Sequence, residues 1–113
     1  MALIIENVSP ANGIQAENIR TKLAKFAVCM EAVLKTKDAK YEGRIYNLDQ
    51  LITHLIKEIG ELEDELMLAP EGTDYRLGRI MDEALDVANM CMYVHDECAA
   101  QIRFRASTRW TCL

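Results

Sequence analysis

Apolar residues recur at alternating steps of four and three along the middle of the chain, and this spacing predicts an α-helix with one packed seam. The seam consists of Leu48, Ile52, Leu55, Ile59, Leu62 and Leu66. Asn47 or Asp49 supplies a side-chain oxygen that can cap the start of this helix. The run Ala69-Pro70-Glu71-Gly72 ends it, because proline cannot continue the helical hydrogen-bond ladder. The middle of the chain is therefore expected to form a helix that packs inside a bundle.

Helical spacing continues on both sides of this segment. We expect a first helix from about Ala16 to Lys35, and a third from Thr73 or Asp74 to about Ile102. The polar stretch 36–46 contains a glycine and is expected to be a loop. Glycine and proline are scarce elsewhere, and half of the residues are hydrophobic. Together these features predict an all-α fold.

A chain of 113 residues is expected to form one domain, residues 1–113, with an N-terminal arm at 1–14 and a C-terminal tail at 103–113. The third helix carries an apolar arc that is wider than one buried side requires. The arc comprises Ile80, Ala84, Leu85, Val87, Ala88, Cys91, Met92, Val94 and Cys98. A second buried side predicts contact with another copy, so the helical bundle is expected to be completed by oligomerisation.

The net charge of −5 argues against nucleic acid and against an anionic membrane surface as partners. The apolar start, Met1 to Ile5, lacks the basic n-region and the long h-region of a secretory signal. No apolar run approaches the roughly 20 residues that are needed to cross a bilayer. We therefore expect a cytoplasmic protein.

The cysteines agree with that expectation. Cys29, Cys91 and Cys98 fall within apolar helical stretches and are expected to be small buried hydrophobic residues, while Cys112 lies in the tail. No CxxC pair is present, so neither a zinc site nor a redox pair is predicted.

Two acidic pairs lie beside the apolar faces of the second and third helices. Glu58 and Glu61 are three residues apart and share one face of the second helix. Glu83 and Asp86 have the same spacing on the third. The short connection between these helices predicts antiparallel packing, so the four carboxylates can converge. A divalent cation relieves their repulsion, and oxygen-only ligands suit Mg²⁺ or Mn²⁺ better than zinc. Each pair taken alone is equally consistent with a solvated acidic face.

The residues around these pairs resemble the MazG-like all-alpha nucleoside triphosphate pyrophosphohydrolases. That family has an ExxE motif on one helix and an ExxD motif on a later one, as found here within Lys57–Leu62 and at Glu83–Asp86. Tyr41–Gly43 and Ile80–Met90 extend the resemblance, which runs from about Phe26 to Asp96. It implies a helical bundle of the all-alpha NTP pyrophosphatase type, assembled as a homodimer or as a tetramer of two dimers.

The resemblance assigns Mg²⁺ binding to Glu58, Glu61, Glu83 and Asp86, with Mn²⁺ able to substitute. It implies hydrolysis of a nucleoside triphosphate, (d)NTP, to (d)NMP and pyrophosphate, in the house-cleaning of nucleotide pools. We expect water to attack the α-phosphorus, with Glu61 or Glu58 as the candidate catalytic base. The family usually opens its first motif with two adjacent glutamates, and here the first of these is Lys57. This departure leaves open the number of metal ions and the identity of the base.

Further residues are candidates for contacting the substrate. They are Lys37, Lys40, Tyr41, His54, Lys57 and Asn89, together with Lys35, Arg76 and Arg79. The basic groups could grip phosphates, and Tyr41 could stack on a base. Asn89 offers hydrogen bonds to a nucleotide or to a ligand carboxylate. For His54 and for the basic residues the alternative is a solvated surface position.

Two other functions are compatible with the sequence. One is a non-catalytic, oligomeric helical binding module with a degenerate acidic site, an interpretation that Lys57 favours. The other is a metal-dependent HD phosphohydrolase, since His95-Asp96 spells the dyad of that class. Such sites need additional histidine ligands, and His54 is the only other histidine in the chain. Metal-dependent release of pyrophosphate separates the expected enzyme from the binding module.

Overall fold

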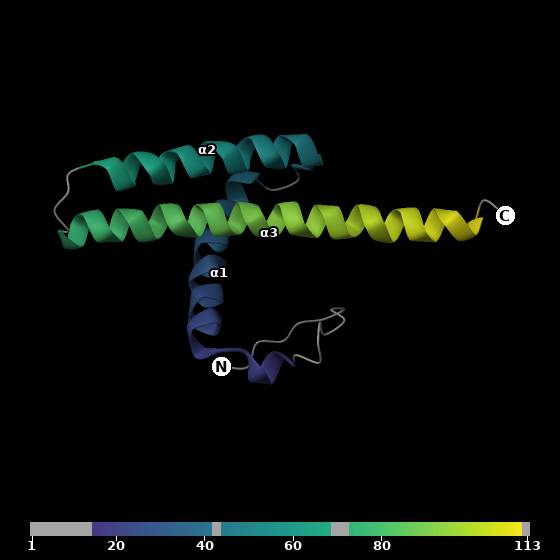
Figure 1. Ribbon diagram of the computed structural model, residues 1–113, viewed down its shortest axis with the longest axis horizontal. Coiled ribbons are helices and arrows are strands. Elements are labelled where there is room, and N and C mark those ends of the chain that lie inside the picture. The colour runs from purple at the N-terminus through teal and green to yellow at the C-terminus, as the bar shows by residue number, and fades with distance from the viewer. Residues whose placement is uncertain (1–14, 42–43, 69–72, 112–113) are drawn as a thin grey trace.

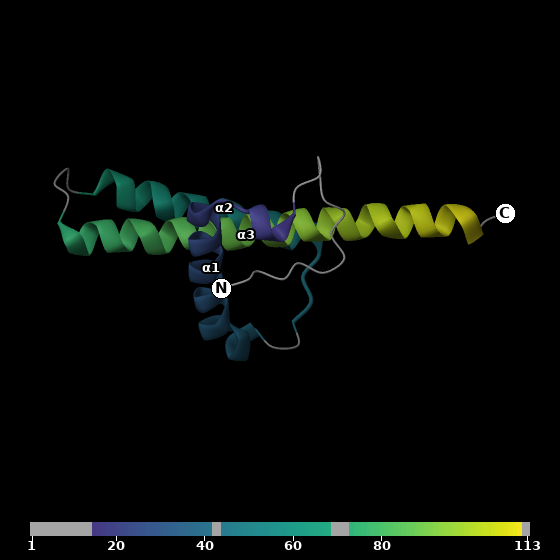
Figure 2. The same ribbon diagram turned by 90° about the horizontal axis from the view of Figure 1, so that it is seen from below.

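The computed structural model describes residues 15–41, 44–68 and 73–111. These ranges comprise a short 3₁₀ turn, η2 (Ala16–Asn18), and three helices, α1 (Thr21–Tyr41), α2 (Leu48–Met67) and α3 (Asp74–Thr111). No strand occurs within them, which confirms the expected all-α fold. α2 and α3 lie side by side and antiparallel, and α1 crosses α3 (Figures 1 and 2). The expected N-terminal arm, residues 1–14, lies outside the described residues.

Side-chain capping explains where α2 begins and ends. The Oδ1 atom of Asn47 accepts a hydrogen bond from the backbone N–H of Gln50 at 2.9 Å, and Oε1 of Gln50 accepts one from the N–H of Asn47 at 2.9 Å. This reciprocal pair is a capping box, so Asn47 is the cap. At the other end, the Arg76 guanidinium donates to the carbonyls of Leu66 and Leu68, each at 2.9 Å. It thereby satisfies acceptors that the helix itself leaves unpaired.

The first helix differs from its sequence prediction at both ends. α1 begins at Thr21 rather than near Ala16, and it continues to Tyr41 instead of ending near Lys35. Residues 36–41 are therefore helical, and the expectation of a loop there is wrong. The segment is polar but contains neither glycine nor proline, and its lysines and alanine are good helix formers.

The third helix is also longer than expected. α3 continues to Thr111 rather than ending near Ile102, so most of the predicted tail, residues 103–113, is helical. No glycine or proline follows Gly78 to interrupt it. Its C-terminal part extends well beyond the N-terminal end of α2 (Figure 1). Among the described residues, no helix is both long enough and apolar enough to cross a membrane.

A single chain covers little of its apolar surface. Leu51 is the only hydrophobic residue that is buried within the described part of the chain. Large apolar side chains are exposed on every helix, among them Leu23, Leu66, Met81 and Phe104. A folded monomer normally buries more of its hydrophobic residues than this.

Two of the cysteines contradict the sequence prediction. Cys29 on α1 and Cys91 on α3 are exposed rather than buried, and Cys98 is half-buried. The first two lie on helix faces that no other described helix covers, so an apolar sequence context did not ensure their burial.

Candidate metal centre

Three carboxylates converge where α2 passes α3. Glu58 of α2 and Glu83 and Asp86 of α3 each offer one oxygen, and these oxygens lie within 4.8 Å of one another. All three residues are half-buried. The antiparallel packing of the two helices thus brings members of both acidic pairs into one cluster.

Glu61, the fourth expected metal ligand, lies at the edge of this cluster and is not one of the three. Its side chain is 41% exposed, and its Oε1 atom is 3.8 Å from Nζ of Lys57, which lies one turn earlier on α2. Glu61 nevertheless adjoins Glu58 on the same helix. In this structure it is therefore a neighbour of the three-oxygen group.

Burial and mutual repulsion change the acidity of the cluster. Burial raises the pKa of the Glu58 carboxyl to about 7, and contact with Glu61 and the charges of Glu61 and Asp86 add to the rise. The nearby ammonium of Lys37 opposes it. The pKa of Glu83 is raised as well, first by burial and then by the neighbouring carboxylates. Without a bound cation, the cluster therefore retains protons that an isolated carboxylate would release.

Two oxygens of the cluster have no partner in the described part of the chain. The Oε2 atoms of Glu58 and Glu83 are both buried and accept no hydrogen bond. A buried polar atom without a partner costs about 1–3 kcal/mol. A cation or a hydrogen-bond donor bound between the helices removes that cost, and carboxylate oxygens are the ligands that Mg²⁺ prefers.

Lys37 brings a positive charge into contact with the cluster. Its Nζ atom lies 2.9 Å from Oδ1 of Asp86, with side chains that are 42% and 21% exposed. Lys37 reaches this position from α1, which crosses α3 here, and not from the loop that the sequence predicted. The contact ties α1 to α3 and partly neutralises one carboxylate.

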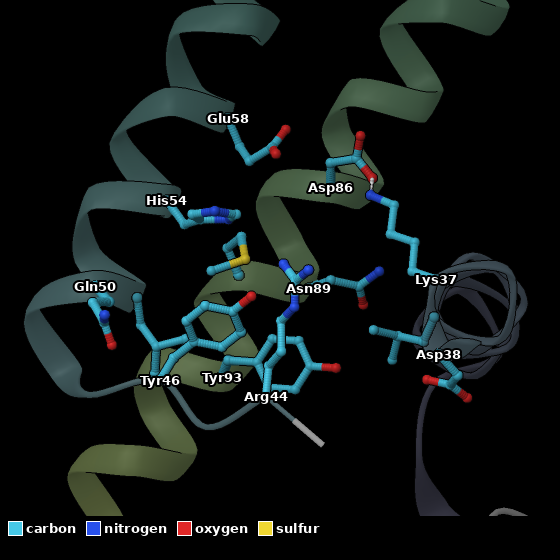
Figure 3. Close-up of a pocket in the computed structure, with 13 residues that line it drawn as sticks. Lys37, Asp38, Arg44, Tyr46, Gln50, His54, Glu58, Asp86, Asn89 and Tyr93 are labelled. Carbon is cyan, nitrogen blue, oxygen red and sulfur yellow. Dashed lines mark hydrogen bonds and ion pairs between the residues drawn. The ribbon is translucent and has the colours of Figure 1, made fainter. Parts of the chain in front are cut away.

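A cavity of about 480 Å³ opens beside the carboxylates. Figure 3 shows Glu58 and Asp86 at one end of it and Arg44, Tyr46 and Tyr93 at the other. Its volume is within the range of small-molecule sites. The arrangement combines an acidic end, which suits a metal ion, with an aromatic and cationic end, which suits a planar organic group.

The structure divides the predicted substrate-contacting residues into two groups. Lys37, His54 and Asn89 line the cavity, and the rings of His54 and Tyr46 lie 6.0 Å apart between centroids. Lys40 and Lys57 are exposed and are not among the residues that line it, and the side chain of Tyr41 lies outside the described residues. Of the six candidates Lys37, Lys40, Tyr41, His54, Lys57 and Asn89, three therefore line the cavity in which a ligand would bind.

The two arginines at the start of α3 are held within the chain. Arg76 binds the last carbonyls of α2, as described above. In Arg79, Nη2 lies 2.6 Å and Nε lies 2.7 Å from Oε1 of Glu65. Glu65 is only 6% exposed. A buried carboxylate needs such a partner. Both guanidinium groups thus join α2 to α3 and do not face the cavity.

Arg44, Tyr46 and Tyr93 are cavity residues that the sequence reasoning missed. Tyr93 follows Asp86 by seven residues, which is two helical turns, so helical spacing could have placed it on the same face. Burial raises the pKa of Tyr93, and nearby acidic groups add to the rise, which keeps its phenol neutral. Arg44 and Tyr46 lie between α1 and α2, where no periodicity marks a residue for the cavity.

Fold and site together define an all-α protein with a three-carboxylate candidate metal centre beside a small-molecule cavity. Comparisons with protein-family models, with curated proteins and with solved structures found no match for this chain. The resemblance to MazG-like proteins therefore rests on the sequence motifs alone.

Proposed function

We propose that this protein is a Mg²⁺-dependent nucleoside triphosphate pyrophosphohydrolase of the MazG-like type. The reaction is hydrolysis of (d)NTP to (d)NMP and pyrophosphate, with the house-cleaning of nucleotide pools as its role. The observation that carries the proposal is the group Glu58, Glu83 and Asp86, whose oxygens lie within 4.8 Å of one another beside a cavity of about 480 Å³. An acidic protein can bind an anionic triphosphate when a metal ion lies between them.

The donor set fits Mg²⁺. Glu58, Glu83 and Asp86 present only carboxylate oxygens, and two buried oxygens of the group lack any partner among the described residues. These three side chains would hold the ion, and Mn²⁺ could replace it. When bound, the ion neutralises charge on carboxylates and phosphates and acts as a Lewis acid.

The chain's own residues account for the remaining chemistry. Lys37, which lies 2.9 Å from Asp86, brings positive charge to the end of the cavity that would receive the phosphates. Glu61 is our candidate for orienting the attacking water and accepting its proton, because it adjoins the cluster without belonging to the three-oxygen group. Glu58 is the alternative base, since it adjoins Glu61 on α2 and lines the cavity. Attack on the α-phosphorus forms a bond to the oxygen of water and breaks the bond to the bridging oxygen, so pyrophosphate leaves.

We also propose that the active form is a homodimer or a tetramer of two dimers. Large apolar side chains are exposed on all three helices, whereas a folded monomer normally buries more of them. The proposal predicts a sedimenting species of two or four times the chain mass of 12.8 kDa. A stable, well-folded monomer at micromolar concentration would contradict it.

A non-catalytic binding module with a degenerate acidic site is the second candidate function. Two contacts favour it, because the chain's own lysines partly neutralise the acids. Lys57 lies 3.8 Å from Glu61, and Lys37 lies 2.9 Å from Asp86. Such a protein would need no metal ion to relieve the repulsion.

Pyrophosphate release from a panel of ribo- and deoxynucleoside triphosphates, measured with Mg²⁺ and then with EDTA, tests the proposal. We expect release that requires Mg²⁺ and falls by about a hundredfold or more in Glu83→Gln. Asp82→Asn is the matched control, because Asp82 is an exposed neighbour on α3 outside the cluster. Folded wild-type protein that is silent across the panel would instead favour the binding module.

A further inference from the structure

Asn89 is a buried polar residue whose acceptor is unused. The residue is 5% exposed, lies on α3 and is among the residues that line the cavity. Its Nδ2 atom donates a hydrogen bond to the carbonyl of Met30 on α1, at 3.4 Å, while Oδ1 is buried and has no partner. Because a carbonyl can only accept, this contact fixes which end of the carboxamide faces α1. The oxygen that remains requires a donor.

The position of Asn89 along α3 indicates which part of a ligand meets it. With a helical rise of 1.5 Å per residue, Asn89 lies about 4.5 Å and Tyr93 about 10 Å beyond Asp86 along the helix axis. The three residues share one face, and Figure 3 shows Asn89 between the carboxylate end and the aromatic end. A nucleotide with its phosphates at the carboxylates places its sugar near Asn89 and its base near Tyr93, because only O5′ and C5′ separate phosphate from sugar.

The chemistry of the nucleotide limits which of its groups can donate a hydrogen bond to Oδ1 of Asn89. Ionised phosphate oxygens only accept hydrogen bonds, so they cannot satisfy Oδ1 of Asn89. The base begins beyond the sugar and lies at the level of Tyr93. At the level of Asn89, a nucleotide offers the hydroxyl groups of its sugar as donors.

We propose that Oδ1 of Asn89 accepts a hydrogen bond from a sugar hydroxyl of the bound nucleotide, and that Asn89 thereby determines which sugars the protein takes. This inference rests on the proposed function, since it needs the phosphates to lie at the carboxylate cluster. A nucleotide without that hydroxyl leaves Oδ1 buried and unpaired, and sites of this kind discriminate strongly against the analogue that lacks the group.

The test compares the affinities of one nucleoside triphosphate in its ribo, 2′-deoxy and 2′,3′-dideoxy forms. Calorimetry with the full chain and Ca²⁺ in place of Mg²⁺ measures binding without relying on turnover. We expect the wild-type affinity to fall by about tenfold or more either when the 2′-hydroxyl is removed or when the 3′-hydroxyl is then removed. Loss between ribo and deoxy assigns the 2′-hydroxyl, and loss between deoxy and dideoxy assigns the 3′-hydroxyl.

Two variants show whether Asn89 causes the discrimination. Asn89→Ala removes the acceptor, so it should bind the discriminated pair of sugars with equal affinity. Asn89→Asp keeps an acceptor but cannot donate to the carbonyl of Met30. It should bind every form more weakly, because of its added charge, while retaining the ratio between sugars. Thermal melts identify any variant that does not fold. The wild-type affinities for the three sugars test the inference even if a variant fails to fold.

Equal wild-type affinity for all three sugars would overturn this inference and leave the proposed function intact, provided that pyrophosphate is still released. Discrimination that persists unchanged in folded Asn89→Ala would also overturn it, since another residue would then contact the hydroxyl. Failure of every nucleotide to bind, together with silence in the pyrophosphate assay, would overturn the proposed function and this inference with it.

Discussion

The ammonium nitrogen of Lys37 lies 2.9 Å from Oδ1 of Asp86, so residues that are 49 positions apart form an ion pair between α1 and α3. Asp86 is also a proposed metal ligand. The chain's own cation therefore competes with a metal ion for the same carboxylate. Both side chains are partly exposed, so the pair itself contributes only about 0.2–1 kcal/mol to stability.

Replacing Lys37 with alanine should make the protein more responsive to Mg²⁺. In EDTA we expect Lys37→Ala to lower the free energy of unfolding by up to about 1 kcal/mol, because the carboxylates lose a counter-charge. The rise in Tm on adding Mg²⁺ should then be larger than in the wild type, since the ion has no competitor. Lys35→Ala, an exposed residue of α1, is the matched control. Equal Mg²⁺ shifts in Lys37→Ala and the wild type would exclude this competition.

The metal-free protein should become less stable as pH rises through the titration of Glu58. Burial raises the pKa of this carboxyl from 4.5 to about 7, so between these values the unfolded chain has lost a proton that the folded chain retains. The stability that the protonated group contributes is complete below pH 4.5 and is lost as the pH passes about 7. We expect a loss of about 1–2 kcal/mol after allowing for solvent screening.

Urea unfolding of the wild type and of Glu58→Gln in EDTA, at pH 5 and at pH 8, isolates this contribution. Glutamine does not titrate, so the variant should gain stability relative to the wild type as the pH rises. Mg²⁺ should stabilise the wild type more at pH 8 than at pH 5, because metal binding requires ionised carboxylates. Parallel pH profiles for the two proteins in EDTA would show that Glu58 titrates normally.

The capping box at the start of α2 should contribute measurably to the free energy of unfolding. Asn47→Ala removes the acceptor for the N–H of Gln50 and should lower the free energy of unfolding by about 1 kcal/mol. Asn47→Asp retains an acceptor at the same place and should lose much less. Chemical denaturation of both variants provides the comparison, and an alanine variant as stable as the wild type would mean that α2 does not depend on this cap.

Much of the fold followed from the spacing of apolar residues and from local capping chemistry. The seam from Leu48 to Leu66 predicted α2, and the turn signals around Pro70 predicted its end to within a few residues. The spacing of Glu58 on α2, and of Glu83 and Asp86 on α3, placed all three beside a helix–helix contact. These features are local, so sequence patterns record them directly.

Features that depend on tertiary packing did not follow from the sequence. Lys37 was expected on a loop because the polar stretch 36–46 contains a glycine, but that glycine is Gly43, and no glycine or proline interrupts α1 before Tyr41. Glu58 and Glu61 belong to the same motif, yet the packing of α2 against α3 brings Glu58 into the three-oxygen group and leaves Glu61 at its edge. Arg44 and Tyr46 line the cavity from the segment just before α2, where no local periodicity marks them.

The most direct test of the proposed chemistry is hydrolysis in water enriched in ¹⁸O, with the products followed by ³¹P NMR. The substrate is the nucleoside triphosphate that releases most pyrophosphate in the panel. Attack at the α-phosphorus predicts ¹⁸O in the nucleoside monophosphate and unlabelled pyrophosphate, only when Mg²⁺ is present. Label in pyrophosphate, release of orthophosphate, or no product at all from the folded protein would contradict the assignment of this carboxylate cluster to pyrophosphohydrolysis.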